Sequence, residues 1–111
     1  MLIRPMSEAD AAAIALVNRD MRYQASAEQI VQRFHSIAGM PGNALFVAES
    51  EGVVLGWAHA RVVRLLQSEP YVSLASVMLR QQAKRERVGA ALIDACRRWA
   101  RELGYADVLL P

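Results

Sequence analysis

Residues 83–92, AKRERVGAAL, have the residue types and spacing in this sequence that most directly suggest chemistry. The cations Lys84, Arg85 and Arg87 precede an amphipathic run of helical periodicity, and Gly89 lies at its start. The first N–H groups of a helix have no intrahelical partner, and with the helix dipole they favour an anion. Cationic side chains beside them add attraction for phosphate. The stretch therefore predicts an anion-binding helix start, and a charged, solvated helix start is the alternative.

His59 is the residue best suited by type to accept a proton near neutral pH. It lies in a strand pattern whose alternation places Trp57 and Arg61 on the same face. These side chains are candidates for lining a substrate pocket, although a half-buried sheet face explains the same pattern. Cys96 lies beside an apolar helical stripe and is expected in the core. Two histidines and one cysteine at these spacings predict no metal site.

The elements that would position these residues follow from periodicity and from helix caps. Ser7 and Ser26 each precede an acidic or amide residue three positions later, which is typical of a capping box. Glu51-Gly52 predicts a hairpin turn, and Gly104 is the expected C-cap residue of the last helix. Strands are expected at residues 2–5, 44–50, 53–65, 71–79 and 105–111, helices at 7–17, 26–37 and 88–103, and a turn at 66–70.

The resulting order is β-α-α-β-β-β-α-β, an α/β (α+β) chain with a central mixed sheet flanked by helices. A crossover helix joins the last two strands, so these strands are expected to be parallel. With 111 residues, 54% of them hydrophobic, residues 1–111 are expected to form one domain with a substantial core.

Charge and composition exclude several classes of function. The net charge of +2 and the lack of helix-turn-helix spacing argue against a nucleic-acid partner. No apolar run approaches the ~18 residues that span a bilayer, so no membrane partner is expected. The single cysteine and the absence of a signal-peptide pattern indicate a cytoplasmic protein.

The element order, the opening IRPMSEAD and the stretch VMLRQQAKRERVGAALIDACRRWARELGYADVLL together resemble the GNAT family of N-acetyltransferases. The resemblance covers essentially the whole chain and is most specific over residues 74–110. RRWARELGY, residues 97–105, is similar to the end of the long helix in many members. Lys84 corresponds to an arginine of the family's loop motif and Gly89 to its last glycine.

The resemblance implies acetyl-CoA as co-substrate and direct attack by a primary amine of a small molecule or peptide. It implies that the strand before the loop holds the pantetheine arm through its backbone and that amides at the helix start hold the pyrophosphate. The implied cofactor-binding residues are Val77, Met78, Leu79, Lys84, Arg85, Glu86, Arg87, Val88, Gly89 and Ala90.

This sequence departs from the family pattern at the loop and at the position of the base. Arg85 and Arg87 replace loop glycines, and a bulky residue keeps the amides available only if its φ is negative and its side chain points away. Ser73 stands where many relatives have a glutamate that activates the amine. Its hydroxyl is a poor base, which leaves His59 and Ser73 as the candidate catalytic residues.

The chain is also shorter than the family pattern, which continues with another helix and two strands. Its last strand is therefore expected to be an exposed edge, and such edges pair with other chains. A homodimer is expected, with strand exchange as one form of it. The alternative function is a catalytically inactive, truncated acetyltransferase-like domain that serves as a dimerising or ligand-binding module.

Overall fold

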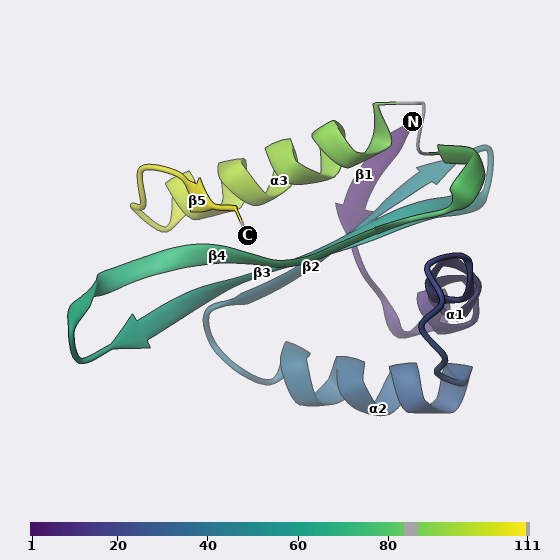
Figure 1. Cartoon of the computed structure of the whole chain (residues 1–111), viewed down its shortest axis with the longest axis horizontal. Helices are drawn as coiled ribbons and strands as arrows, with labels where there is room; N and C mark the ends of the chain where they lie inside the picture. Colours follow the sequence, from purple (N-terminus) through teal and green to yellow (C-terminus); the bar gives the residue numbers. More distant parts are fainter. Residues whose placement is uncertain (84–86, 111) are drawn as a thin grey trace.

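A computed structural model describes residues 1–83 and 87–110 of the chain (Figure 1). One five-stranded sheet has the strand order β1-β2-β3-β4-β5. Neighbouring strands are antiparallel except β4 and β5, which are parallel. The elements are β1 (Leu2–Pro5), η1 (Glu8–Asp10), α1 (Ala11–Asp20), α2 (Ala27–Ala38), β2 (Asn43–Ser50), β3 (Val53–Leu65), β4 (Ser68–Leu79), η2 (Gln81–Ala83), α3 (Val88–Glu102) and β5 (Val108–Leu109).

The helices cover both faces of this sheet. Helix α3 lies across one face, and α1 and α2 lie on the other (Figure 1). Leu92 and Cys96 of α3 are fully buried against the sheet, whereas Ile14 and Val17 of α1 and Ile30 of α2 are buried on the opposite face. The predicted element order, the mixed sheet and the parallel last pair are confirmed.

The predicted caps and turns explain where the elements begin and end. The Ser26 hydroxyl accepts from the Gln29 N–H at 3.1 Å, while the Gln29 side chain accepts from the Ser26 N–H at 3.0 Å. Gly104 follows the α3 C-cap at φ +95°, and its N–H donates to Arg101 O. The Tyr105 N–H donates to Ala100 O, which completes a Schellman motif.

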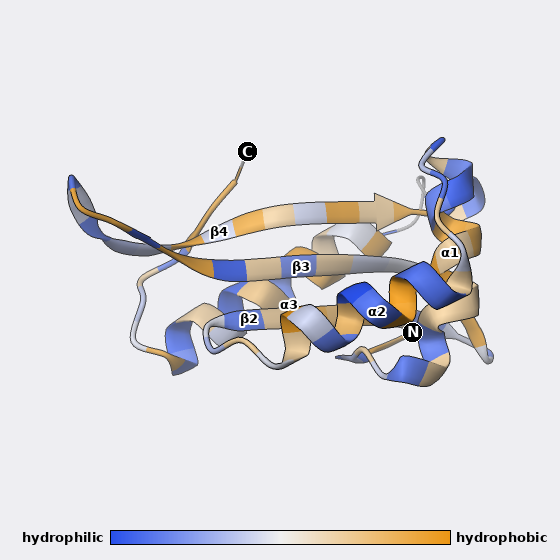
Figure 2. Ribbon diagram, turned by 90° about the horizontal axis from the view of Figure 1, so that it is seen from below, coloured by the Kyte–Doolittle hydropathy of each residue, from blue (hydrophilic) through white to orange (hydrophobic). Residues whose placement is uncertain are grey.

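Several boundaries differ from the sequence prediction. The helix predicted over 7–17 begins as the 3-10 turn η1, and α1 continues to Asp20. The predicted turn at 66–70 is wrong in extent, because Leu65 pairs with Ser68 and leaves a two-residue loop. Pro70 lies within β4, opposite a register irregularity between Val63 and Leu65. Proline has no N–H to donate to a neighbouring strand, and an irregular site of this kind tolerates it. The resulting long β3–β4 hairpin extends beyond α2 and α3 (Figure 2). The last strand is confined to Val108–Leu109.

None of the helices in the described ranges has the length and apolarity needed to cross a membrane.

Candidate active site

Strand β4 has an open edge along its second half. Among the described residues, β5 pairs with β4 only at Val72 and Ser73. Immediately beyond this pairing β4 contains a bulge, because His59 pairs with Ser76 but the next residue of β3 pairs with Leu74. A bulge bends a strand and increases its twist. The edge from Leu74 to Leu79 is thus left available for backbone hydrogen bonds to an extended ligand.

The N-terminus of α3 lies at the end of this open edge. A Cβ added at Gly89 would lie 3.4 Å from Leu79 Cδ1, so the start of the helix packs closely on the last residue of β4. The Ala91 N–H donates to Arg87 O at 3.0 Å. The N–H groups of Val88, Gly89 and Ala90 precede this bond, and helix geometry leaves such groups without intrahelical partners.

Arg87 shows how a bulky residue fits where the family pattern has glycine. It is the N-cap residue of α3, with φ −80° and ψ 30°, and it is exposed. Its φ is therefore negative, so the backbone needs no glycine here. The predicted site residues Lys84, Arg85 and Glu86 lie outside the described residues.

The other predicted cofactor residues are brought together by β4 and α3. Val77 and Leu79 pack against the core beneath α3, and Met78 packs on the opposite face of the sheet. Val88 is buried and Ala90 is exposed. The start of α3 at Gly89 therefore adjoins the end of the open strand edge at Leu79.

His59 lies one strand inward from that edge, on the face covered by α1 and α2. It pairs with Leu45 of β2 and Ser76 of β4. Its Nε2 lies 2.8 Å from Asn43 Oδ1. Asn43 Nδ2 points to the carbonyls of Met40 and Pro41 at 3.5 Å, which assigns the proton of this bond to His59 Nε2.

This hydrogen bond leaves His59 Nδ1 as the unprotonated ring nitrogen. Burial, with a smaller contribution from the charge of Arg61, lowers the pKa of His59. The imidazole is therefore neutral at physiological pH and able to accept a proton. Ser73 pairs with Arg61 of β3 and Leu109 of β5, in the closed part of the β4–β5 boundary.

A small cavity of about 130 Å³ lies beside His59, between the sheet and the first two helices. Trp57 lines it, and its Nε1 donates to Asn18 Oδ1 at 2.8 Å. Arg33 of α2 is also part of the lining. Asn18, Arg33 and Asn43 were not predicted from the sequence, because their proximity to His59 depends on strand register and on how the helices pack.

Gly56 is a further position of the site that was not predicted from the sequence. A Cβ there would lie 2.7 Å from Met78 O and 2.8 Å from Leu79 Cδ2, so only glycine lets β3 and the end of β4 approach this closely. The available signal was an isolated glycine inside a strand pattern, which often marks close backbone approach.

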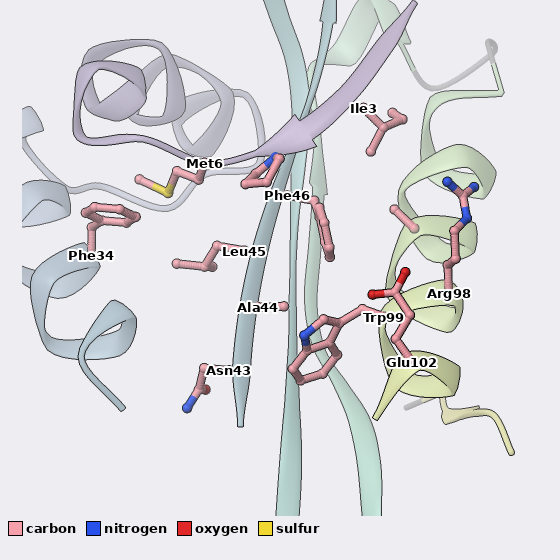
Figure 3. A pocket seen from close by; sticks show the side chains of 12 residues that line it. Ile3, Met6, Phe34, Asn43, Ala44, Leu45, Phe46, Arg98, Trp99 and Glu102 are labelled. Atoms are coloured by element: carbon pink, nitrogen blue, oxygen red, sulfur yellow. The ribbon is translucent and has the colours of Figure 1, made fainter. Parts of the chain in front are cut away.

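A larger cavity of about 500 Å³ lies at the opposite edge of the sheet (Figure 3). It surrounds the start of β2 at Asn43 and Ala44, with Arg98 and Trp99 of α3 on one side and Phe34 of α2 on the other. It contacts neither the open edge of β4 nor the start of α3. Size alone therefore does not identify the reactive site.

Comparison with known proteins decides the family. The model of the acetyltransferase (GNAT) family matches residues 11–110. The chain belongs to the GNAT acetyltransferase family. No curated protein matches it.

Solved GNAT structures share the fold. A GNAT acetyltransferase from Staphylococcus aureus superposes with a TM-score of 0.86 at 12% identity, over 99% of this chain and 84% of that one. The 6'-N-acetyltransferase AAC(6')-IG from Acinetobacter haemolyticus, an aminoglycoside-modifying enzyme, gives 0.81 at 20% identity, over 100% and 79%. The aminoglycoside N-acetyltransferase AAC(6')-Iy in complex with CoA gives 0.81 at 21% identity, over 99% and 75%. At these identities the likeness establishes the α+β GNAT fold.

Proposed function

We propose that this protein is an acetyl-CoA-dependent N-acetyltransferase that acetylates a primary amine of a small molecule or peptide. The observation that carries the proposal is the open edge of β4 leading directly to the N-terminus of α3. An extended amide-containing arm that ends in phosphates matches both parts of this surface. Family membership and the CoA complex of AAC(6')-Iy support the same ligand.

Different residues of this chain would bind different parts of acetyl-CoA. Backbone groups of Val77 and Leu79 bind the pantetheine arm as an added strand would bind. The N–H groups of Val88, Gly89 and Ala90 bind the pyrophosphate, helped by the positive end of the α3 dipole. Exposed Arg87 adds a cation beside those phosphates.

The chemistry that acetyl-CoA supplies is an activated thioester, whose carbonyl carbon forms a bond to the amine nitrogen as its bond to sulfur breaks. His59 Nδ1 takes the proton that the amine loses, the thiolate that leaves takes a proton from solvent water, and His59 then releases its proton to solvent. Asn43 holds the imidazole in the required tautomer through its bond to Nε2. Ser73 lies where β4 is paired on both sides, so we assign it no proton transfer.

Isothermal titration of the purified protein with acetyl-CoA tests the proposal. We expect a Kd in the micromolar range, and an amine screen that follows release of free thiol then tests turnover. Absence of binding by the folded protein would overturn the proposal. The chain would then be a non-catalytic acetyltransferase-like module.

Two substitutions at one position test where the ligand binds. Gly89→Ala adds a Cβ at an ordinary 3.4 Å contact with Leu79 and should leave the affinity for acetyl-CoA nearly unchanged. Gly89→Trp places an indole at the junction of β4 and α3 and should abolish binding. If the tryptophan variant is folded by circular dichroism and binds normally, the ligand is not at this junction.

A further inference from the structure

The cavity beside His59 has apolar walls and very few polar groups that are free to contact a ligand. The Asn18 side-chain oxygen accepts from Trp57, and His59 Nε2 is bonded to Asn43. Among the described residues, three side-chain groups therefore remain for an acceptor molecule. They are His59 Nδ1, the Asn18 side-chain NH₂ group and the guanidinium of Arg33 on α2.

Charge around this cavity has one sign. No Asp or Glu is among the residues that line it. Arg61 lies on the same strand face as His59, and its positive charge is felt at the imidazole. Within the described part of the chain, no ion pair to a carboxylate involves Arg33 or Arg61. The lining of the cavity therefore has one cationic side chain, Arg33, and no acidic one, while Arg61 is an exposed residue outside the lining.

We propose that the acceptor is a small amine that also carries an anionic group, a carboxylate or a phosphate, bound chiefly by Arg33 and secondarily by Arg61. This inference rests on the proposed acetyltransferase function. A guanidinium forms paired charge-assisted hydrogen bonds with either anion. The same cations disfavour a polycationic amine, which gives the site selectivity by repulsion as well as by attraction.

The size of the cavity sets the scale of the acceptor. A volume of about 130 Å³ corresponds to about four water molecules at their ~30 Å³ share of liquid water. It accommodates the compact part of a molecule such as a small amino acid, with its anionic group at Arg33 and its amine toward His59.

Matched pairs of amines test the proposal and separate the two anions. Alanine and alaninamide differ in the carboxylate, glucosamine 6-phosphate and glucosamine differ in the phosphate, and spermidine provides a polycation. Binding of each is measured by isothermal titration with and without CoA, and acetylation by thiol release. We expect the anionic member of at least one pair to bind about tenfold or more tightly than its partner, as one charged hydrogen-bond pair provides. Spermidine should bind most weakly.

Variants assign this preference to named residues. Arg33→Gln should weaken binding of the anionic member about tenfold and leave its partner within about twofold. Arg61→Gln should have a smaller effect of the same kind. Arg64→Gln is the matched control, because Arg64 is exposed on β3, is not part of the cavity lining and loses the same charge.

The outcomes distinguish this inference from the proposed function. If acetyl-CoA binds and both members of each pair bind and react equally, or spermidine is preferred, the acceptor class is wrong and the acetyltransferase proposal stands. If acetyl-CoA does not bind but anion selectivity is present and lost in Arg33→Gln, the proposed reaction is wrong and the anion site stands. Equal loss in Arg33→Gln and Arg64→Gln would overturn the role of Arg33.

Discussion

At the level of single residues, the proposed transfer depends on the protonation state of His59. Burial lowers its pKa below the ordinary 6.5, so the fraction of unprotonated Nδ1 increases as the pH rises through that lowered value. We expect kcat to increase with pH on the acid side and to be level at neutral pH. His59→Gln should lower kcat about 10²–10⁴-fold, the usual contribution of a general base, and remove this acid limb.

The pH profiles of kcat for the wild type and His59→Gln check this expectation. Asn43→Ala is a useful companion, because it removes the partner of Nε2 but keeps the imidazole, and it should lower kcat less than His59→Gln. An acid limb that persists unchanged in His59→Gln would show that another group, or the amine itself, sets the pH dependence.

A second residue-scale feature is the ion pair between Arg4 and Asp10. Two bonds of 2.8 and 2.9 Å join the guanidinium to the carboxylate, whose side chain is only 7% exposed. The hydrogen bond from Arg4 is the main cause of a lowered Asp10 pKa. The pair therefore stabilises the fold above the unfolded-state value of about 3.9, and this stabilisation is lost as the pH falls through the lower folded-state pKa.

Arg4→Ala should reduce the free energy of unfolding at pH 7 by about 2–3 kcal/mol. This is less than the ~3–5 kcal/mol for a fully buried pair, because Arg4 is 29% exposed and Asp10 retains the Ser7 N–H. Urea unfolding at pH 7 and near pH 3 measures the effect, which should shrink at the acid pH. An equal loss at both pH values would mean that packing of the arginine stem, rather than charge, is responsible.

At the level of elements, Gly56 connects stability to the proposed cofactor edge. Gly56→Ala places a Cβ 2.7 Å from Met78 O, and backbone cannot move aside as a flexible side chain can. We expect a loss of about 1–3 kcal/mol in unfolding free energy, typical of overpacking, and weaker acetyl-CoA binding because Met78 and Leu79 must shift. Thermal unfolding and titration measure the two effects.

Gly39→Ala is the matched control for this element-scale effect. Gly39 has a helical φ of −79°, and its added Cβ would contact only His35 O at 3.5 Å. It should leave both stability and acetyl-CoA affinity close to wild type. If Gly56→Ala behaves like Gly39→Ala, β3 and β4 are not as tightly apposed as the structure indicates.

The elements were predictable from the sequence where the determinants are local. Capping at Ser26 and the turn at Glu51-Gly52 depend on neighbours within four residues, and both occur as predicted, the turn with φ of +51° and +80°. The start of β4 was not predictable, because Pro70 is a local turn signal that long-range pairing with β3 overrides. The hydrogen bond between His59 and Asn43 could not be predicted from the sequence either, since it depends on the β2–β3 register.

At the level of the whole molecule, the β5 side of the sheet presents an apolar edge. Leu109 is 60% exposed, and among the described residues β5 pairs only with β4. An exposed strand edge of this kind pairs readily with a second chain. We expect a homodimer whose mass, by light scattering after size exclusion, increases from one chain to two with concentration.

Substitution at this edge distinguishes dimerisation through β5 from non-specific association of exposed apolar residues. Leu109→Lys should shift the equilibrium to the monomer, because a lysine on an edge strand opposes pairing. Leu66→Lys is the control, since Leu66 is fully exposed at the tip of the β3–β4 hairpin, away from β5. Dissociation by Leu66→Lys and not by Leu109→Lys would place the interface on the hairpin. A monomer at every concentration would remove the interface altogether and leave β5 as a free edge beside the proposed cofactor strand.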